Sequence, residues 1–413
     1  MIVKLKIGVY TEQRLDAGGG FNEALSSIIR LQNLFGERLE LLVSSGSSQN
    51  SDALKQNNIK VIPARISKFE KIGLWLRHKI LSSIANVIPS NSSLVRKLKA
   101  KILKLNSFER RFVKNNVDLV FFPAPEPMAK YMEETNYILS VWDLAHREMP
   151  YFPELRNNFD YETREHYFSH VIPRALLIVV GHDVCKSQLI TYYKVPENKI
   201  IKIPFSPAKS IIDSSATKFD DLELRNLKVG KFIFYPAQYW AHKNHRFLID
   251  LLYQIIKRHD PKFKLVFTGS DKGNIEFLRR YSMDLGIGNS IIFCGFVSSN
   301  DVRLLYEKCA SLIMPSFIGP GTLPTLEGLS LGTLVIVEDT AQNRDFYGPN
   351  MIYQDFDCEQ NAADVFMLNL SRIKGTKLLN KQVLQYIEKS SEHENFEVLI
   401  NRKLKYLKTF RRI

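Results

Sequence analysis

Residues 315–339 read PSFIGPGTLPTLEGLSLGTLVIVED and carry the most informative pattern of this 413-residue chain. The apolar run at 333–339 is typical of a buried strand, and the run at 310–316 predicts a second strand just before the quoted loop. Between them, the prolines and glycines predict a turn that opens a helix near Leu323. Strand, helix and strand in this order indicate an α/β unit with parallel strands.

The same alternation of short β-rich runs and helical stretches extends over the whole chain. The runs that predict strands lie at 4–10, 39–45, 117–125, 137–143 and 175–182, and then at 231–237, 264–270, 290–296, 310–316 and 333–339. A stretch with weak periodicity, 200–221, separates the two sets, and the chain is longer than one core normally organises. We therefore expect two Rossmann-like α/β domains, at 1–207 and 208–390, followed by a helical segment at 391–413.

Composition excludes several classes of protein. The chain is 45% hydrophobic and 24% charged, which is typical of soluble globular proteins. The N-terminus lacks the pattern of a signal peptide, and no window holds about 18 uninterrupted apolar residues, so we expect a cytoplasmic protein. The four cysteines have neither zinc-site spacing nor a disulfide framework, and reduced thiols are expected.

The formal net charge of +14 indicates an acidic partner, and the positive charge is concentrated at 60–114. This segment holds fourteen Lys or Arg against two Glu, interleaved with Leu, Ile, Phe and Trp75. The pattern predicts amphipathic helix lying on an anionic membrane surface. A solvated helix face remains the alternative. Nucleic acid is not favoured, because no recognition signature accompanies the charge.

In parallel sheets, ligands bind beyond the carboxyl ends of the strands, so the loops there are the candidates for binding and catalysis. After the first strand, Gly18 to Gly20 open a helix whose N-terminal amides would face an anion, which makes Gly19 and Gly20 candidate binding residues. The pattern matches neither of the common phosphate-binding motifs, and a plain flexible turn is the alternative.

Two kinds of loop in the second half of the chain, a helix start and glycine-containing strand ends, predict a nucleotide site. Lys243 stands at a helix start, where an ammonium and free backbone amides would together hold a diphosphate. Gly269, Phe296 and Val297 follow two further strands, in glycine-containing exits suited to close approach to a planar base. A surface ion pair is the alternative for Lys243.

The quoted loop completes this prediction. Gly319 and Gly321 permit close approach, and the amides around Thr322 and Leu323 would face a phosphate at the helix start. Glu327 lies one turn into the helix, where a carboxylate accepts two hydroxyls of a ribose; stabilisation of the helix dipole is its alternative role. The sequence thus predicts a nucleoside diphosphate site.

The order of glycine-rich loop, WDLAH, KNH, GFV and proline-glycine loop with Glu327 resembles the retaining glycosyltransferases of the GT-B fold, specifically glycosyltransferase family 4. The resemblance covers most of the chain. It implies two Rossmann-like domains facing a central cleft, with the nucleotide-sugar held mainly by the second domain and the acceptor by the first. It also implies that the helix at 391–413 crosses back to the first domain.

Two positions depart from the family pattern. Lys243 stands at the family's lysine, but Gln238 stands where the family has an arginine, so one diphosphate-neutralising charge is absent. Glu327 matches the second of two paired glutamates, and Gly319 replaces the first, which usually touches the donor sugar. A branch of the family with a Gly-Pro-rich loop at this place is similar, so the departure resembles a subfamily feature.

The resemblance also points to catalytic candidates in the first domain. Where the family has a His-Asp pair, this chain has Trp142-Asp143, with His146 three residues further on. Together with Lys243, which would stabilise the leaving diphosphate, Asp143 and His146 are the residues expected to hold the acceptor or the sugar hydroxyls. A satisfied structural histidine is the alternative for His146.

These observations predict a retaining, metal-independent hexosyltransferase that uses no cofactor. The expected donor is GDP-mannose, and the expected acceptor is a lipid-linked oligosaccharide in bacterial O-antigen or capsule synthesis, at the inner face of the plasma membrane. No DxD pair follows a strand, and lysine with helix amides can neutralise a diphosphate without a metal. The alternatives are a UDP-sugar with a soluble or protein acceptor, a non-catalytic nucleotide-binding GT-B partner, and, less favoured, a GT-B epimerase or phosphorylase.

Overall fold

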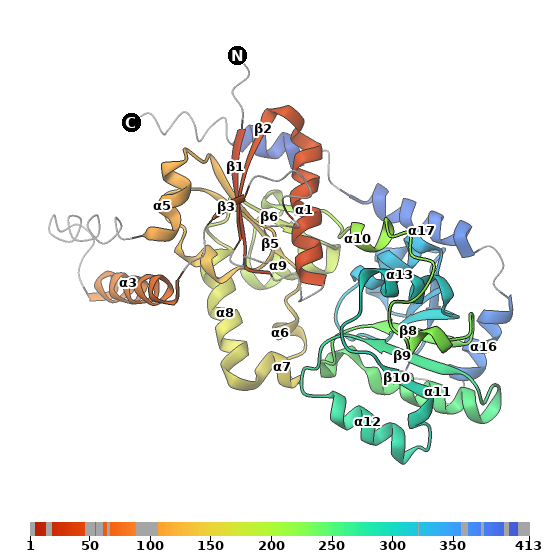
Figure 1. Cartoon of the computed structure of the whole chain (residues 1–413). Helices are drawn as coiled ribbons and strands as arrows, with labels where there is room; N and C mark the ends of the chain where they lie inside the picture. The colour runs from red at the N-terminus through yellow and green to blue at the C-terminus, as the bar shows by residue number, and fades with distance from the viewer. Residues whose placement is uncertain are drawn as a thin grey trace.

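The computed structural model describes residues 5–13, 19–45, 54, 61–63, 67–87, 106–320, 322–356, 362–372, 376–391 and 396–403. These residues form two α/β domains side by side, each built on a parallel sheet flanked by helices (Figure 1).

The first domain contains a seven-stranded sheet of order β3-β2-β1-β4-β5-β6-β7. The strands are β1 (Leu5–Thr11), β2 (Leu39–Ser45), β3 (Val61–Pro63), β4 (Leu119–Phe122), β5 (Tyr137–Val141), β6 (Leu177–Val180) and β7 (Ile200–Lys202), and all neighbours are parallel. Alternate residues of β4 face opposite cores: Leu119 and Phe121 pack with α1 (Gly19–Phe35), and Val120 and Phe122 pack with the other helices. The sheet is therefore covered on both faces.

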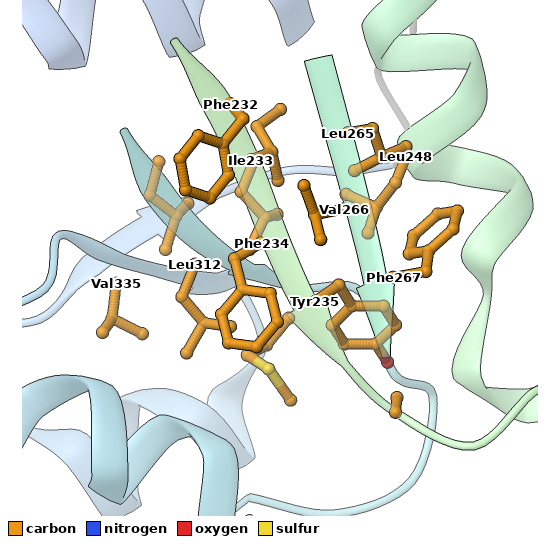
Figure 2. Close-up of a cluster of buried hydrophobic side chains, with 14 of the residues drawn as sticks. Phe232, Ile233, Phe234, Tyr235, Leu248, Leu265, Val266, Phe267, Leu312 and Val335 are labelled. Atoms are coloured by element: carbon orange, nitrogen blue, oxygen red, sulfur yellow. The ribbon is translucent and has the colours of Figure 1, made fainter. Parts of the chain in front are cut away.

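The second domain contains a six-stranded parallel sheet of order β10-β9-β8-β11-β12-β13. Its strands are β8 (Phe232–Pro236), β9 (Lys264–Thr268), β10 (Ile291–Phe293), β11 (Ser311–Met314), β12 (Val335–Glu338) and β13 (Ile352–Gln354). The central strands are apolar at most positions, and Figure 2 shows side chains of β8, β9, β11 and β12 packed together with Leu248 of α11 (His245–Arg258). Burial on both faces explains why these strands read as continuous apolar runs.

Helices follow the strands in both domains. In the first domain they are α3 (Lys68–Val87), α5 (Ser107–Lys114), α6 (Ala145–Glu148), α7 (Pro153–Arg156), α8 (Asp160–Val171) and α9 (Asp183–Tyr193). In the second they are α10 (Lys209–Ile212), α11, α12 (Ile275–Asp284), α13 (Ser299–Lys308), α14 (Leu323–Leu331), α15 (Ala341–Tyr347), α16 (Ala362–Arg372) and α17 (Thr376–Lys389).

The chain crosses between the domains twice. After β7 it enters the second domain, where Ala208 and Ile211 already belong to that domain's core. After α17 it returns, and Phe396 and Ile400 pack into the core of the first domain with residues of β1 and α1. The expectation that the last helical segment crosses back to the first domain is thereby confirmed.

Part of the basic segment at 60–114 lies in the described structure, as β3, α3 and α5. Its most lysine-rich part, 88–105, lies outside the described residues. Across the part of the chain that the structure describes, every helix is too short or too polar to cross a bilayer.

Candidate functional site

A cavity of about 280 Å³ lies between the two domains, at the carboxyl ends of their strands. The first domain lines it with residues that follow β5 and β6, and the second domain with residues that follow β11 and β12. The polar and turn residues among them include Asp143, Glu148, His182, Ser316, Gly319, Pro320 and Asn343. The position agrees with the rule that ligands of parallel sheets bind beyond the carboxyl ends of the strands.

Lys243 does not line this cavity, but it contacts Ser316, which does. It ends the short 3-10 turn Ala241–Lys243 that follows β8, and its Nζ donates to the Ser316 Oγ at 3.3 Å. Burial lowers the pKa of Lys243, while Asp143 and Glu154 partly oppose that shift. The ammonium therefore lies in surroundings that a bound anion would stabilise.

The same loop leads from Ser316 into α14. Thr322 is the N-cap residue with extended backbone, and its Oγ1 lies 2.9 Å from the Oγ1 of Thr325. The first N–H groups of a helix lack acceptors within the helix. Pro324 has no N–H, so in the first turn of α14 it is the N–H of Leu323, directly after Thr322, that is available to an anion. Gly321, a predicted member of this group, lies outside the described residues.

Glu327 is placed one turn into α14, as expected, but its carboxylate is only 5% exposed. Its Oε2 accepts a hydrogen bond of 2.8 Å from the Tyr306 hydroxyl, and its Oε1 accepts one of 3.4 Å from the backbone N–H of Ala208. Burial raises its pKa to about 7. A carboxylate has about four acceptor sites, so capacity for ribose hydroxyls remains.

The glycine-rich start of α1 lies against the start of α14. A Cβ at Gly19 would lie 3.3 Å from the Leu323 side chain. A Cβ at Gly20 would lie 2.5 Å from the Gln13 Oε1 and 3.3 Å from the Trp142 ring. A side chain at position 20 would require the Gln13 side chain to shift, and the structure brings the two predicted glycine-rich loops together.

The exits of β8, β9 and β10 are also joined. A Cβ at Gly269 would lie 2.5 Å from the carbonyl oxygen of Ala237, and the N–H of Gly269 donates to the carbonyl oxygen of Gly295 at 2.6 Å. Beside them, Gln238 accepts a hydrogen bond from the Trp240 indole at 3.0 Å.

Phe296 and Val297 continue this row of strand exits. Phe296 is 68% exposed directly after the β10 exit, and Val297 packs partly against the core. An exposed aromatic ring beside glycine backbone is a suitable platform for a planar base.

The two catalytic candidates of the first domain have different surroundings. Asp143 lines the cavity, and its Oδ1 accepts a hydrogen bond of 3.0 Å from the backbone N–H of Ala145. His146 is not among the cavity-lining residues; its ring is fully buried and stacked on Phe168, with Nε2 3.3 Å from the Glu165 carboxylate. Burial lowers the pKa of His146. This placement agrees with the structural alternative considered for His146.

Two features of the site were not predicted. Glu154 of α7 accepts a hydrogen bond of 2.9 Å from the backbone N–H of His242, and the His242 Nδ1 lies 2.5 Å from the same oxygen. Burial lowers the pKa of His242 to about 4. This hydrogen bond joins the first domain to the second at His242, the residue directly before Lys243. His182 was also not predicted. Its position just beyond the end of β6, where ligands of parallel sheets bind, could have indicated it.

Comparisons with known proteins relate the second domain to a family and the whole chain to a fold. Residues 221–391, most of the second domain, match the family model described as "Glycosyl transferases group 1". An uncharacterized glycosyltransferase of Methanocaldococcus jannaschii is 26% identical over 157 residues, which are 37% of this chain and 39% of the relative. The O-antigen chain mannosyltransferase RfbU of Salmonella typhimurium is 26% identical over 164 residues, 40% of this chain and 42% of the relative. The chain spans about two fifths of the length of these curated relatives.

Solved structures match over nearly the whole chain. Anabaena HepE in complex with UDP and glucose gives a TM-score of 0.62 at 14% identity, covering 97% of this chain and 100% of that chain. A glycosyltransferase from Rickettsia africae gives a TM-score of 0.62 at 16% identity, covering 97% and 99%. At these identities the likeness concerns the fold, and it confirms the predicted GT-B architecture of two Rossmann-like domains.

Within the described residues, no group of three or more His, Cys, Asp or Glu side chains is arranged to hold a metal ion.

Proposed function

We propose that this chain, which has the GT-B fold and a second domain matching the group 1 glycosyl transferases, transfers a sugar from a nucleotide-diphosphate donor to an acceptor held by its first domain. The observation that carries the proposal is the contact of Lys243 with Ser316, on the loop that precedes α14 and lines a cavity shared by both domains. A cation and free helix amides together are suited to a diphosphate.

In this proposal the second domain binds the donor. The diphosphate contacts Lys243 and the amides around Leu323, the ribose contacts Glu327, and the base lies at the joined exits near Gly269 and Phe296. The sugar then extends into the cavity toward Asp143. The transfer is retaining: the acceptor hydroxyl attacks the face from which the diphosphate departs, and the protein contributes mainly electrostatic stabilisation of the leaving group. Because an ammonium and amides neutralise the diphosphate, no metal is required.

The proposed donor is GDP-mannose, since the matching relative from Salmonella typhimurium is a mannosyltransferase of O-antigen chains. A UDP-sugar is the second candidate, because the structural neighbour from Anabaena was solved with UDP and glucose. The proposed acceptor is a lipid-linked oligosaccharide of a bacterial surface polysaccharide. A non-catalytic nucleotide-binding protein is the competing function, favoured by Gln238 and Gly319 at positions where family 4 has charged residues.

The test is a thermal-shift series against GDP, UDP, ADP, dTDP and CMP, each with and without EDTA. Ligands that bind the folded state raise its melting temperature, and a hundredfold excess over Kd corresponds to about 2.7 kcal/mol. We expect a shift with one diphosphate, unchanged by EDTA, followed by sugar transfer from the matching donor. No shift with any nucleotide would reject a donor site, and a shift without transfer would favour the non-catalytic alternative. Activity lost in EDTA and restored by magnesium would contradict metal independence.

We further propose that α3 binds the anionic membrane surface. Its apolar side chains Phe69, Ile72, Trp75, Leu76 and Ile80 are between 46% and 86% exposed and follow helical spacing. The helix is oriented by buried Leu74 and by the ion pair of Arg77 with Glu133, so this stripe faces away from the domain. Figure 1 shows α3 on the outside of the first domain. Lys79 lies 5.1 Å from the Trp75 ring and adds a cation at the stripe.

Changing Phe69 and Trp75 together to glutamate is expected to lower binding to vesicles containing phosphatidylglycerol by about tenfold or more, because two large apolar side chains leave the interface and two negative charges enter it. Vesicle sedimentation at low and high salt measures the effect. Val229→Glu, at an exposed apolar position of the second domain, is the matched control. Absence of wild-type binding at low salt would contradict the proposal.

A further inference from the structure

His182 lies at the wall of the cavity, between β6 and α9, and is 5% exposed. Its Nδ1 accepts a hydrogen bond of 3.2 Å from the backbone N–H of Cys185, so the imidazole caps α9. A neutral imidazole that accepts at Nδ1 carries its hydrogen on Nε2. The local backbone therefore fixes which ring nitrogen is the donor.

The ring is also fixed in charge and orientation. Burial lowers the pKa of His182 to about 4; Lys202 adds to the shift, and Asp143 and Asp183 oppose it. The imidazole is thus neutral near pH 7. Phe346 packs against the ring edge at 6.5 Å between centroids. His182 is therefore a rigid, uncharged donor.

The Nε2 of this ring faces the proline-glycine loop across the cavity. A Cβ at Gly319 would lie 3.5 Å from the His182 Nε2, and Gly319 has φ of +54°, a conformation that favours glycine. Among the residues that the structure describes, none accepts a hydrogen bond from this nitrogen. This N–H has no protein acceptor and belongs to a ring that lines the cavity, so it is available to an acceptor on whatever occupies the cavity.

The chemistry of the occupant follows from the rest of the wall. The cavity is small for a ligand site, and Asp143, Thr340 and Asn343 line it with hydroxyl, amide and carboxylate groups. Such a lining suits a compact ring with several hydroxyls. A neutral imidazole is a poor partner for a phosphate, whereas Lys243 at Ser316 is a good one.

We propose that the Nε2–H of His182 donates a hydrogen bond to a hydroxyl of the sugar carried by the donor. This inference rests on the proposed function and assigns to the first domain a residue that selects and positions the donor sugar. Gly319 contributes by leaving the space in which that hydroxyl lies.

Two substitutions separate the donor role from the cap. His182→Asn keeps an oxygen near the position of Nδ1 and caps α9, but it removes the Nε2–H. His182→Gln places an amide N–H near the position of Nε2 and gives up the cap. Calorimetry measures Kd for GDP and GDP-mannose, or for UDP and UDP-glucose if the nucleotide series selects uridine, and steady-state kinetics measure KM for donor and acceptor.

For His182→Asn we expect unchanged nucleoside diphosphate affinity, about 3- to 10-fold weaker nucleotide-sugar affinity, and an unchanged melting temperature. For His182→Gln we expect nucleotide-sugar affinity within about twofold of wild type, with a lower melting temperature from loss of the cap.

Three results would overturn the proposal. The first is wild-type affinity of His182→Asn for both ligands, the second is an equal loss for both, and the third is an effect on the acceptor KM alone. Failure of the proposed function is distinct from these, because the wild-type protein would then bind none of the nucleotides.

Discussion

Lys243→Ala is expected to reduce sugar transfer by about 10²- to 10³-fold and to abolish the thermal shift given by the selected nucleoside diphosphate, with the fold intact. The reason is that its ammonium, which contacts Ser316 on the loop that precedes α14, is the cation proposed to neutralise the leaving diphosphate. Gln238, which stands where the glycosyltransferases that this chain resembles have an arginine, is uncharged and cannot replace the charge of Lys243.

The control for this change is Lys257→Ala, which removes a lysine of equal charge from the exposed end of α11. Circular dichroism and the melting temperature show whether either variant perturbs the fold. Transfer by Lys243→Ala within a few-fold of wild type would contradict the proposed role of this lysine, whatever the nucleotide series shows.

Lys243 also predicts how binding depends on pH. Burial lowers its pKa, and a bound diphosphate favours the protonated form, so diphosphate affinity should fall as pH rises through the lowered pKa. Lys243→Arg remains charged over this range and should remove the dependence. Calorimetry between about pH 7 and 10, in buffers of different ionisation enthalpy, measures both the affinity and the proton taken up.

The central strands could be predicted from the sequence because they are buried on both faces and therefore read as continuous apolar runs. The three strands that were not predicted, β3, β7 and β13, are each three residues long and lie at sheet edges. Each stands in a stretch with few consecutive apolar residues, whereas β10, an edge strand of the same length, was predicted because its apolar run continues past the strand to Phe296. The loops after the central strands could also be predicted, because each begins where an apolar run ends.

The parts of the site that were missed depend on how side chains are directed and how the domains meet. His146 and His182 both follow strands of the first domain, yet one ring packs on Phe168 and the other lines the cavity. The contact of Glu154 with His242 joins residues far apart in the chain and has no local pattern. Residue type and spacing predict which loops carry chemistry, but the direction of each ring is set by tertiary packing.

Glu327→Gln is expected to stabilise the free protein above neutral pH while weakening nucleotide binding. Burial raises the folded-state pKa of Glu327 from its ordinary value of 4.5 to about 7. The protonated carboxyl is therefore favoured in the fold: its contribution to stability is fully present below pH 4.5 and is lost as pH rises through 7. Glutamine carries no charge, so the free energy of unfolding should exceed that of wild type by about 1–3 kcal/mol at pH 8 and by little at pH 5.

The matched control is Glu126→Gln in the first domain. Glu126 is also buried, with a pKa raised by burial to about 7, and it accepts hydrogen bonds from Thr11 and from the backbone N–H of Glu12. Both variants should show the same pH-dependent gain in denaturant unfolding, because the charge that glutamine removes is the same. Only Glu327→Gln should lose affinity for the nucleoside diphosphate.

The ribose role of Glu327 is tested most directly by pairing this variant with a 2′-deoxynucleoside diphosphate. Each charge-assisted hydrogen bond from a ribose hydroxyl is worth about 1.5–3 kcal/mol, so wild type should bind the ribonucleotide about tenfold or more tightly than its 2′-deoxy counterpart. In Glu327→Gln the preference should shrink toward unity. An unchanged preference, with the stability gain present, would mean that the carboxylate serves Tyr306 and Ala208 alone, and that the ribose is held elsewhere.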